Sequence, residues 1–112
     1  MAKYVTFFTY TSDTWARMIQ EPGDRTAAIR QLAESLGGSV ECVYWMSGPH
    51  DGMVIADLPD SVRGAALSAI VGSTATFKNL ESHELLTQEQ LSQALSLSKD
   101  MMQAYQPPGQ QS

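Results

Sequence analysis

The residues best suited to proton transfer lie in Gly48-Pro49-His50-Asp51-Gly52, a segment that separates two apolar runs. Histidine is the usual general acid or base near neutral pH, and a neighbouring carboxylate can orient it. His50 is therefore the candidate catalytic residue. Aspartate in a turn commonly accepts hydrogen bonds from backbone N–H groups. We expect Asp51 to hold the turn and His50 to meet a ligand; the alternative is that His50 is only a turn residue.

The second histidine, His83, lies close to two carboxylates in Glu81-Ser82-His83-Glu84. In a strand, Glu81 and His83 would share one face. A metal site needs three or four convergent ligands, and two are too few. The sequence also contains no phosphate-binding loop and no serine-nucleophile motif. We therefore expect no metal and no cofactor.

Aromatic residues gather on the segments that are predicted to be strands. A lining of aromatic and hydroxyl groups is typical of a pocket for an apolar small molecule. Core packing is the alternative explanation for the same side chains. With the polar residues named above, the predicted ligand-binding set is Tyr4, Phe8, Tyr10, Tyr44, Trp45, Asp51 and His83.

Four strands are needed to position these residues. Aromatic and β-branched residues predict strands over 3–10, 39–46 and 52–58, and a fourth within 74–86. The five residues Gly48 to Gly52 suit a hairpin connection. On the first three strands both faces are apolar, whereas a sheet with one wet face should alternate. A second copy of the chain is the expected cover for the free face, and folding-over of the C-terminal helix is the alternative.

Helical segments separate and follow the strands. A helix begins after Thr11, breaks at Pro22-Gly23, resumes, and ends at Gly37-Gly38. The next begins at Pro59-Asp60-Ser61 and ends at Gly72, and its predicted buried face is Val62, Ala65, Ala66, Ala69 and Ile70. The last begins at the capping box Thr87 to Gln90, and its predicted buried face is Leu91, Ala94, Leu95 and Met102.

This order predicts an α+β chain with the ferredoxin-like βαββαβ plan and an extra C-terminal helix. The 112 residues fit one domain over 1–105, followed by a flexible tail over 106–112. The net charge of −5 and the scattered basic residues argue against nucleic acid as a partner. No apolar run is long enough to predict a membrane span. The single Cys42, predicted to be buried, requires no oxidising compartment, so we expect a cytoplasmic protein.

The run "GGSVECVYWMSGPHDGMVIADLPD", the alanine-rich helix after it and the later "LLTQEQ" resemble the GYD-domain family. The similarity extends from Tyr4 to about Tyr105. Gly48 and Asp51 match the Gly-Tyr-Asp motif that names the family, and His50 stands where the tyrosine would be. The resemblance implies membership of the dimeric α+β barrel superfamily and a homodimer joined through sheet faces.

That superfamily includes cofactor-free monooxygenases, muconolactone-type isomerases, haem-handling enzymes and domains that sense small ligands. Because one fold serves many functions, three hypotheses follow. The first is a homodimer that binds a small apolar or aromatic molecule. The second is a cofactor-free isomerase or monooxygenase with His50 as acid or base. The third is a structural oligomerisation module.

Overall fold

The computed structural model describes residues 1–109. The strands are β1 (Ala2–Tyr10), β2 (Ser39–Trp45), β3 (Gly52–Leu58) and β4 (Phe77–Leu85). The helices are α1 (Ser12–Gln20), α2 (Arg25–Ser35), α3 (Ser61–Gly72), α4 (Gln88–Met101) and the short 3-10 helix η1 (Met102–Ala104). Of the predicted tail over 106–112, residues 106–109 contain no helix or strand, and 110–112 lie outside the described residues.

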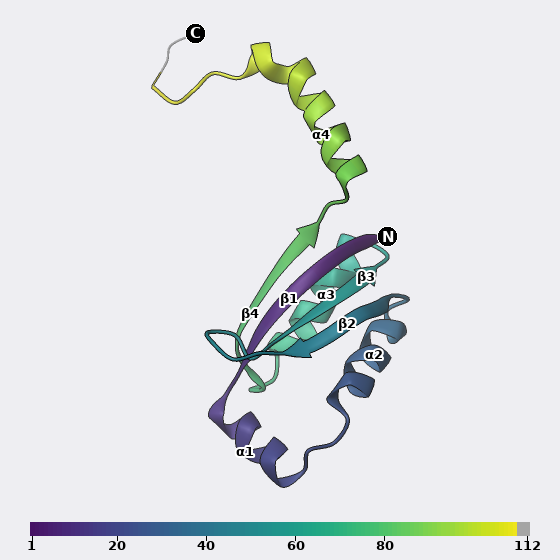
Figure 1. Ribbon diagram of the computed structural model, residues 1–112, viewed down its shortest axis with the longest axis vertical. Coiled ribbons are helices and arrows are strands. Elements are labelled where there is room, and N and C mark those ends of the chain that lie inside the picture. Colours follow the sequence, from purple (N-terminus) through teal and green to yellow (C-terminus); the bar gives the residue numbers. More distant parts are fainter. Residues whose placement is uncertain (110–112) are drawn as a thin grey trace.

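The four strands form one antiparallel sheet in the order β2-β3-β1-β4. Helices α2 and α3 lie on one side of this sheet, and α1 lies beyond the end of β1 (Figure 1). This arrangement confirms the predicted α+β, ferredoxin-like fold. It also confirms that the chain breaks at Pro22-Gly23, because α1 ends before that pair and α2 begins after it.

Each α-helix begins where a side-chain oxygen accepts a hydrogen bond from a backbone N–H of the first turn. Such bonds satisfy donors that have no partner within the helix. At α4 the cap is a full capping box, because the Gln90 side chain in turn accepts from the backbone N–H of Thr87. The four capping residues are Thr11, Asp24, Asp60 and Thr87.

Strand register separates the side chains of the sheet into two faces, because directly paired residues point the same way. The face toward α2 and α3, here called the helix-side face, has rows Trp45-Gly52-Phe8-Leu80 and Val43-Val54-Thr6-Ser82. The opposite face, here called the open face, has rows Tyr44-Met53-Phe7-Glu81 and Cys42-Ile55-Val5-His83. No helix within residues 1–109 lies on the open face (Figure 1).

A register shift in β2 places one residue differently from the predicted alternation. Strict alternation would put Val40 on the same face as Cys42 and Tyr44. The pairing shifts between Val40 and Cys42, so Glu41 is the extra residue and Val40 joins the helix side instead. There Val40 is buried with Ala33 and Ala56. Cys42, expected to be buried, is only half-buried on the open face.

Helix α3 presents a different face to the sheet from the predicted one. Val62 and Ile70 are 75% and 58% exposed, so they do not pack on the sheet. The side that faces the sheet includes Gly64, Ser68 and Val71, and of the predicted face only Ala65 lines the cavity with them. Small and apolar residues occur all round α3, so its hydrophobic pattern does not define a single buried face. Small residues on the sheet side also leave space between helix and sheet.

Helix α4 lies apart from the sheet (Figure 1), so the expectation that it packs on the body is wrong. Leu91 and Leu95 on its predicted buried face are 43% and 59% exposed. Leu86 and the cap Thr87 are the two residues between β4 and α4, and the helix continues away from the sheet after them. The radius of gyration is consequently 18.4 Å, against about 13 Å for a compact domain of this length.

The close packing of Gly52 against Phe8 gives the first testable prediction. A Cβ on Gly52 would lie 2.3 Å from Cζ of Phe8, whose side chain is buried. Gly52→Ala should therefore lower the free energy of unfolding by about 1–3 kcal/mol, measured by urea denaturation. Gly72→Ala is the control, because nothing lies within 4 Å of its Cβ position; it should be neutral or slightly stabilising. Equal stabilities for parent and Gly52→Ala would contradict the packing described.

Candidate functional site

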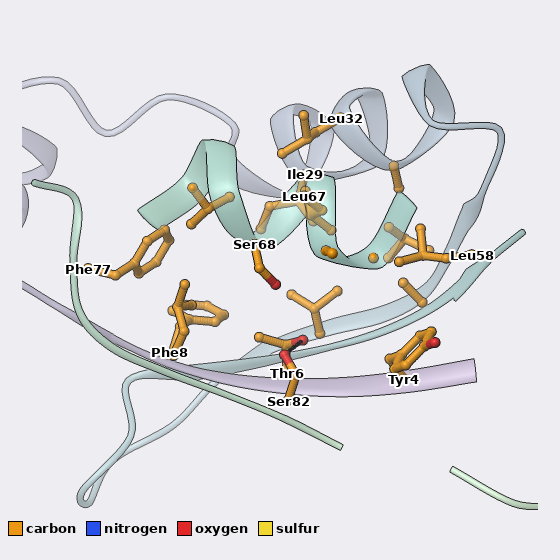
Figure 2. A pocket seen from close by; sticks show the side chains of 18 of the residues that line it. Tyr4, Thr6, Phe8, Ile29, Leu32, Leu58, Leu67, Ser68, Phe77 and Ser82 are labelled. Carbon is orange, nitrogen blue, oxygen red and sulfur yellow. Dashed lines mark hydrogen bonds between the residues drawn. The ribbon is translucent and has the colours of Figure 1, made fainter. Parts of the chain in front are cut away.

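A cavity of about 400 Å³ lies between the helix-side face and helices α2 and α3. Figure 2 shows its lining: side chains from the strands point up, and those from the two helices point down toward them. The space remains because the core is incomplete. Among residues 1–109 no side chain is fully buried, and the buried cluster consists of Ala33, Val40 and Ala56.

The walls of the cavity are mainly apolar. Strands supply most of the floor, including Tyr4, Phe8, Val54 and Phe77, and helices supply the roof, including Ile29, Leu32 and Leu67. This volume and lining are typical of a site for a small apolar molecule, since such pockets usually measure about 300–1,000 Å³.

Besides the hydroxyls of Tyr4, Tyr10 and Ser61, the lining includes those of Thr6, Ser68 and Ser82. The hydroxyls of Thr6 and Ser82 are 2.8 Å apart and bond to each other across β1 and β4. Ser68 also lines the cavity and extends from α3 toward the sheet (Figure 2). A hydroxyl both donates and accepts, so this cluster can bind one polar group of an otherwise apolar ligand.

An aromatic cluster forms one end of the cavity. The rings of Phe8 and Phe77 both contact Tyr10, with centroids 5.2 Å and 5.3 Å from it. Trp15 of α1 packs edge-on against Tyr10 from outside at 5.2 Å. Indole Nε1 of Trp45 donates to the hydroxyl of Tyr10 at 3.3 Å. The position of Tyr10 is thus held from several sides.

Asp51 holds the turn next to this cluster. Its carboxylate accepts from the backbone N–H of Tyr10 at 2.8 Å and from Nε1 of Trp15 at 3.3 Å. The backbone of Asp51 also pairs, donating to the carbonyl of Phe8 and accepting from Met46 N–H. The contacts are those expected of a residue that joins the hairpin to the end of β1.

Removal of the Asp51 carboxylate should destabilise the connection between the hairpin and the end of β1. Asp51→Ala leaves the buried Tyr10 without its acceptor, which should cost about 1–3 kcal/mol in free energy of unfolding. Asp51→Asn retains an acceptor oxygen and should lose less. Chemical denaturation of the three proteins compares them. If Asp51→Ala were as stable as the parent, the hydrogen bond to Tyr10 would have no structural importance.

The two histidines lie on the open face, on either side of Phe7. The ring centroid of Phe7 is 5.1 Å from that of His50 and 6.5 Å from that of His83. Nδ1 of His50 is buried and has no hydrogen-bond partner among residues 1–109. Nε2 of His83 lies 3.0 Å from a carboxylate oxygen of Glu81. Both histidines are therefore separated from the cavity by the sheet itself.

The hydrogen bond from His83 gives a pH-dependent prediction. That bond, with the nearby charges of His83 and His50, holds the pKa of Glu81 below its ordinary value. A lowered carboxyl pKa stabilises the fold above the pKa of the unfolded chain, and this contribution is lost as the pH falls through the lowered value.

His83→Gln should raise the pKa of Glu81 toward its ordinary value. An NMR titration of the Glu81 carboxyl carbon in parent and variant measures the change. Identical titration curves would show that His83 does not influence Glu81.

The structure divides the predicted site residues into groups. Tyr4, Phe8 and Tyr10 line the cavity, while Trp45 and Asp51 support Tyr10 from outside it. Tyr44, His50 and His83 lie on the open face instead.

Sequence reasoning missed the cavity residues of α3 and β4, including Ser68, Val71, Phe77 and Ser82. The spacing of Ser61, Gly64, Ser68 and Val71 is helical and was the available signal. Within residues 1–109 there is no cluster of three or more side chains suited to hold a metal ion. None of the helices in the described range has the length and apolar character needed to span a bilayer.

Comparison with known protein families matches residues 4–95 to the GYD domain. The chain belongs to the GYD-domain family. This match confirms the family inferred from the runs around Gly48 and Asp51. It covers the sheet except for the first two residues of β1, together with α1 to α3 and the first part of α4, so the GYD domain contains the complete cavity. No curated protein matches the chain.

Proposed function

We propose that this GYD-domain protein is a homodimer that binds a small apolar or aromatic molecule in the cavity of each protomer. The observation that carries the proposal is the cavity of about 400 Å³ between the sheet and helices α2 and α3. A ligand there would replace the missing packing between the two layers. Its polar group would meet the hydroxyl cluster of Thr6, Ser68 and Ser82.

The open face supports the dimer. Its central side chains are apolar, and Tyr44 is 63% exposed. Because α4 projects away from the sheet, it leaves this face uncovered. The open face of a second protomer would complete the burial of Phe7, Met53 and Ile55, which are each half-buried in a single protomer.

The enzyme hypothesis requires a second ligand position. His50 is separated by the sheet from the cavity, so acid–base chemistry by His50 needs a substrate on the open face. The unpartnered Nδ1 of His50 favours some polar partner there. A purely structural module would instead form the dimer and bind nothing. A cytoplasmic location accompanies all three hypotheses, because the half-buried thiol of Cys42 needs no oxidising compartment.

A calorimetric titration with 2-naphthol tests the binding proposal. This compound has an apolar aromatic body and one hydroxyl, matching the lining. We expect saturable binding of one molecule per protomer, with a Kd on the order of 0.1 mM or tighter. A ligand with the same hydroxyl and little apolar body, such as ethanol, should not bind. Failure of 2-naphthol and of octan-1-ol to bind at their solubility limits would contradict the proposal and favour the structural module.

A further inference from the structure

A second, smaller cavity of about 240 Å³ adjoins the first. The two share Tyr10 and Arg25 in their linings, so they meet at the aromatic end of the main cavity. The smaller cavity is more polar in character, and α1 supplies Arg17 and Met18 to its wall. The route from the apolar cavity into this space therefore passes Arg25.

The charges around the smaller cavity favour an anion. Two guanidinium groups, Arg17 and Arg25, line it, against the single carboxylate of Glu21. Within the part of the chain that the structure describes, neither arginine forms an ion pair or a side-chain hydrogen bond. The whole chain has a net charge of −5. Two arginines at one cavity, without ion-pair partners in the described part of the chain, therefore make this region more positive than the protein as a whole.

We infer that the ligand of the main cavity is an apolar monocarboxylate whose acid group binds Arg25. This inference rests on the proposed function and names its ligand class. The apolar body would lie between Phe8, Phe77 and the helices, and the carboxylate would reach the shared boundary at Tyr10 and Arg25. A guanidinium binds a carboxylate through two parallel N–H···O bonds. The excess of one positive charge suits a monoanion.

Pairs of ligands with the same body and different head groups test the inference. At pH 7, 2-naphthoate should bind about three- to tenfold more tightly than 2-naphthol, and octanoate more tightly than octan-1-ol. Octylamine should bind more weakly than octan-1-ol because its charge repels Arg25. The preference for the acids should shrink as salt is added, since Arg25 is exposed.

Substitution of Arg25 tests whether the carboxylate of the ligand binds there. Arg25→Gln should remove the preference for 2-naphthoate and leave the affinity for 2-naphthol unchanged. The control is Lys78→Gln, which makes the same change in charge at an exposed residue of β4 that lines neither cavity. It should retain the full preference.

The outcomes separate this inference from the proposed function. If acids and alcohols bind equally well, and Arg25→Gln changes neither, the carboxylate assignment is wrong while the cavity still binds ligands. If the acids are preferred but Arg25→Gln retains that preference, the acid group lies elsewhere and the assignment is equally overturned. If no compound of either class binds, the proposed function itself fails.

Discussion

Phe7→Glu should convert the proposed dimer into a monomer. Phe7 lies at the centre of the open face, between Met53 of β3 and Glu81 of β4. In a symmetric dimer each substitution would occur twice, so two carboxylates would be removed from water. His50 and His83 lie beside Phe7, but the two Glu81 carboxylates also lie there and would repel the new charges. Each uncompensated buried charge costs several kcal/mol, so the dimer Kd should rise at least about a thousandfold. Light scattering at micromolar concentration measures the mass directly.

A matched control distinguishes loss of the interface from a general effect of added charge. Ile70→Glu introduces the same group on the outer side of α3, where Ile70 is 58% exposed. It should remain dimeric. Circular dichroism must show that Phe7→Glu retains its helices and strands. A monomeric parent protein, or a dimeric and folded Phe7→Glu variant, would contradict association through the open face.

Ser68→Phe should abolish ligand binding while leaving the dimer intact. The Ser68 side chain points from α3 into the middle of the cavity (Figure 2). A phenyl ring there would occupy the space of a ligand and remove one of the three central hydroxyls. Binding of 2-naphthol should weaken at least tenfold, because the apolar contacts and the polar contact are lost together. The same calorimetric titration measures the change.

Ala69→Phe is the matched control for Ser68→Phe. Ala69 is the next residue of α3, is exposed and does not line the cavity. Its affinity for 2-naphthol should equal that of the parent. The open face lies on the other side of the sheet, so both variants should be dimers. Unchanged binding in Ser68→Phe would show that the ligand occupies some other place.

The order of elements could be predicted from the sequence because its signals are local. The aromatic and β-branched residues of its segment indicate β1, and capping residues such as Thr11 and Thr87 mark helix starts. Each needs only neighbours along the chain. The side chain of Asp51 was expected to accept hydrogen bonds from backbone N–H groups of its own turn. It accepts instead from Tyr10 N–H and Trp15 Nε1, which are distant in sequence, so these partners could not be predicted from local signals.

The placement of side chains on the two faces could not be fully predicted. One extra residue, Glu41, transfers Val40 to the helix side, and nothing in the local pattern marks the shift. The rotation of α3 depends on its packing against a sheet formed by distant residues. The position of His50 beside Phe7 likewise depends on pairing between β1 and β3. These long-range arrangements decide that the cavity and the histidines lie on opposite sides.

The central claim is that ligand binds between the sheet and the helices, and methyl NMR tests it most directly. In a titration of the ¹³C-methyl-labelled protein with 2-naphthol, signals of Val54, Leu67 and Val71 should shift, with intermolecular NOEs to the naphthol ring. Signals of Val5 and Ile55 on the open face should stay in place. Shifts and NOEs confined to Val5 and Ile55 would place the ligand beside the histidines and contradict the account.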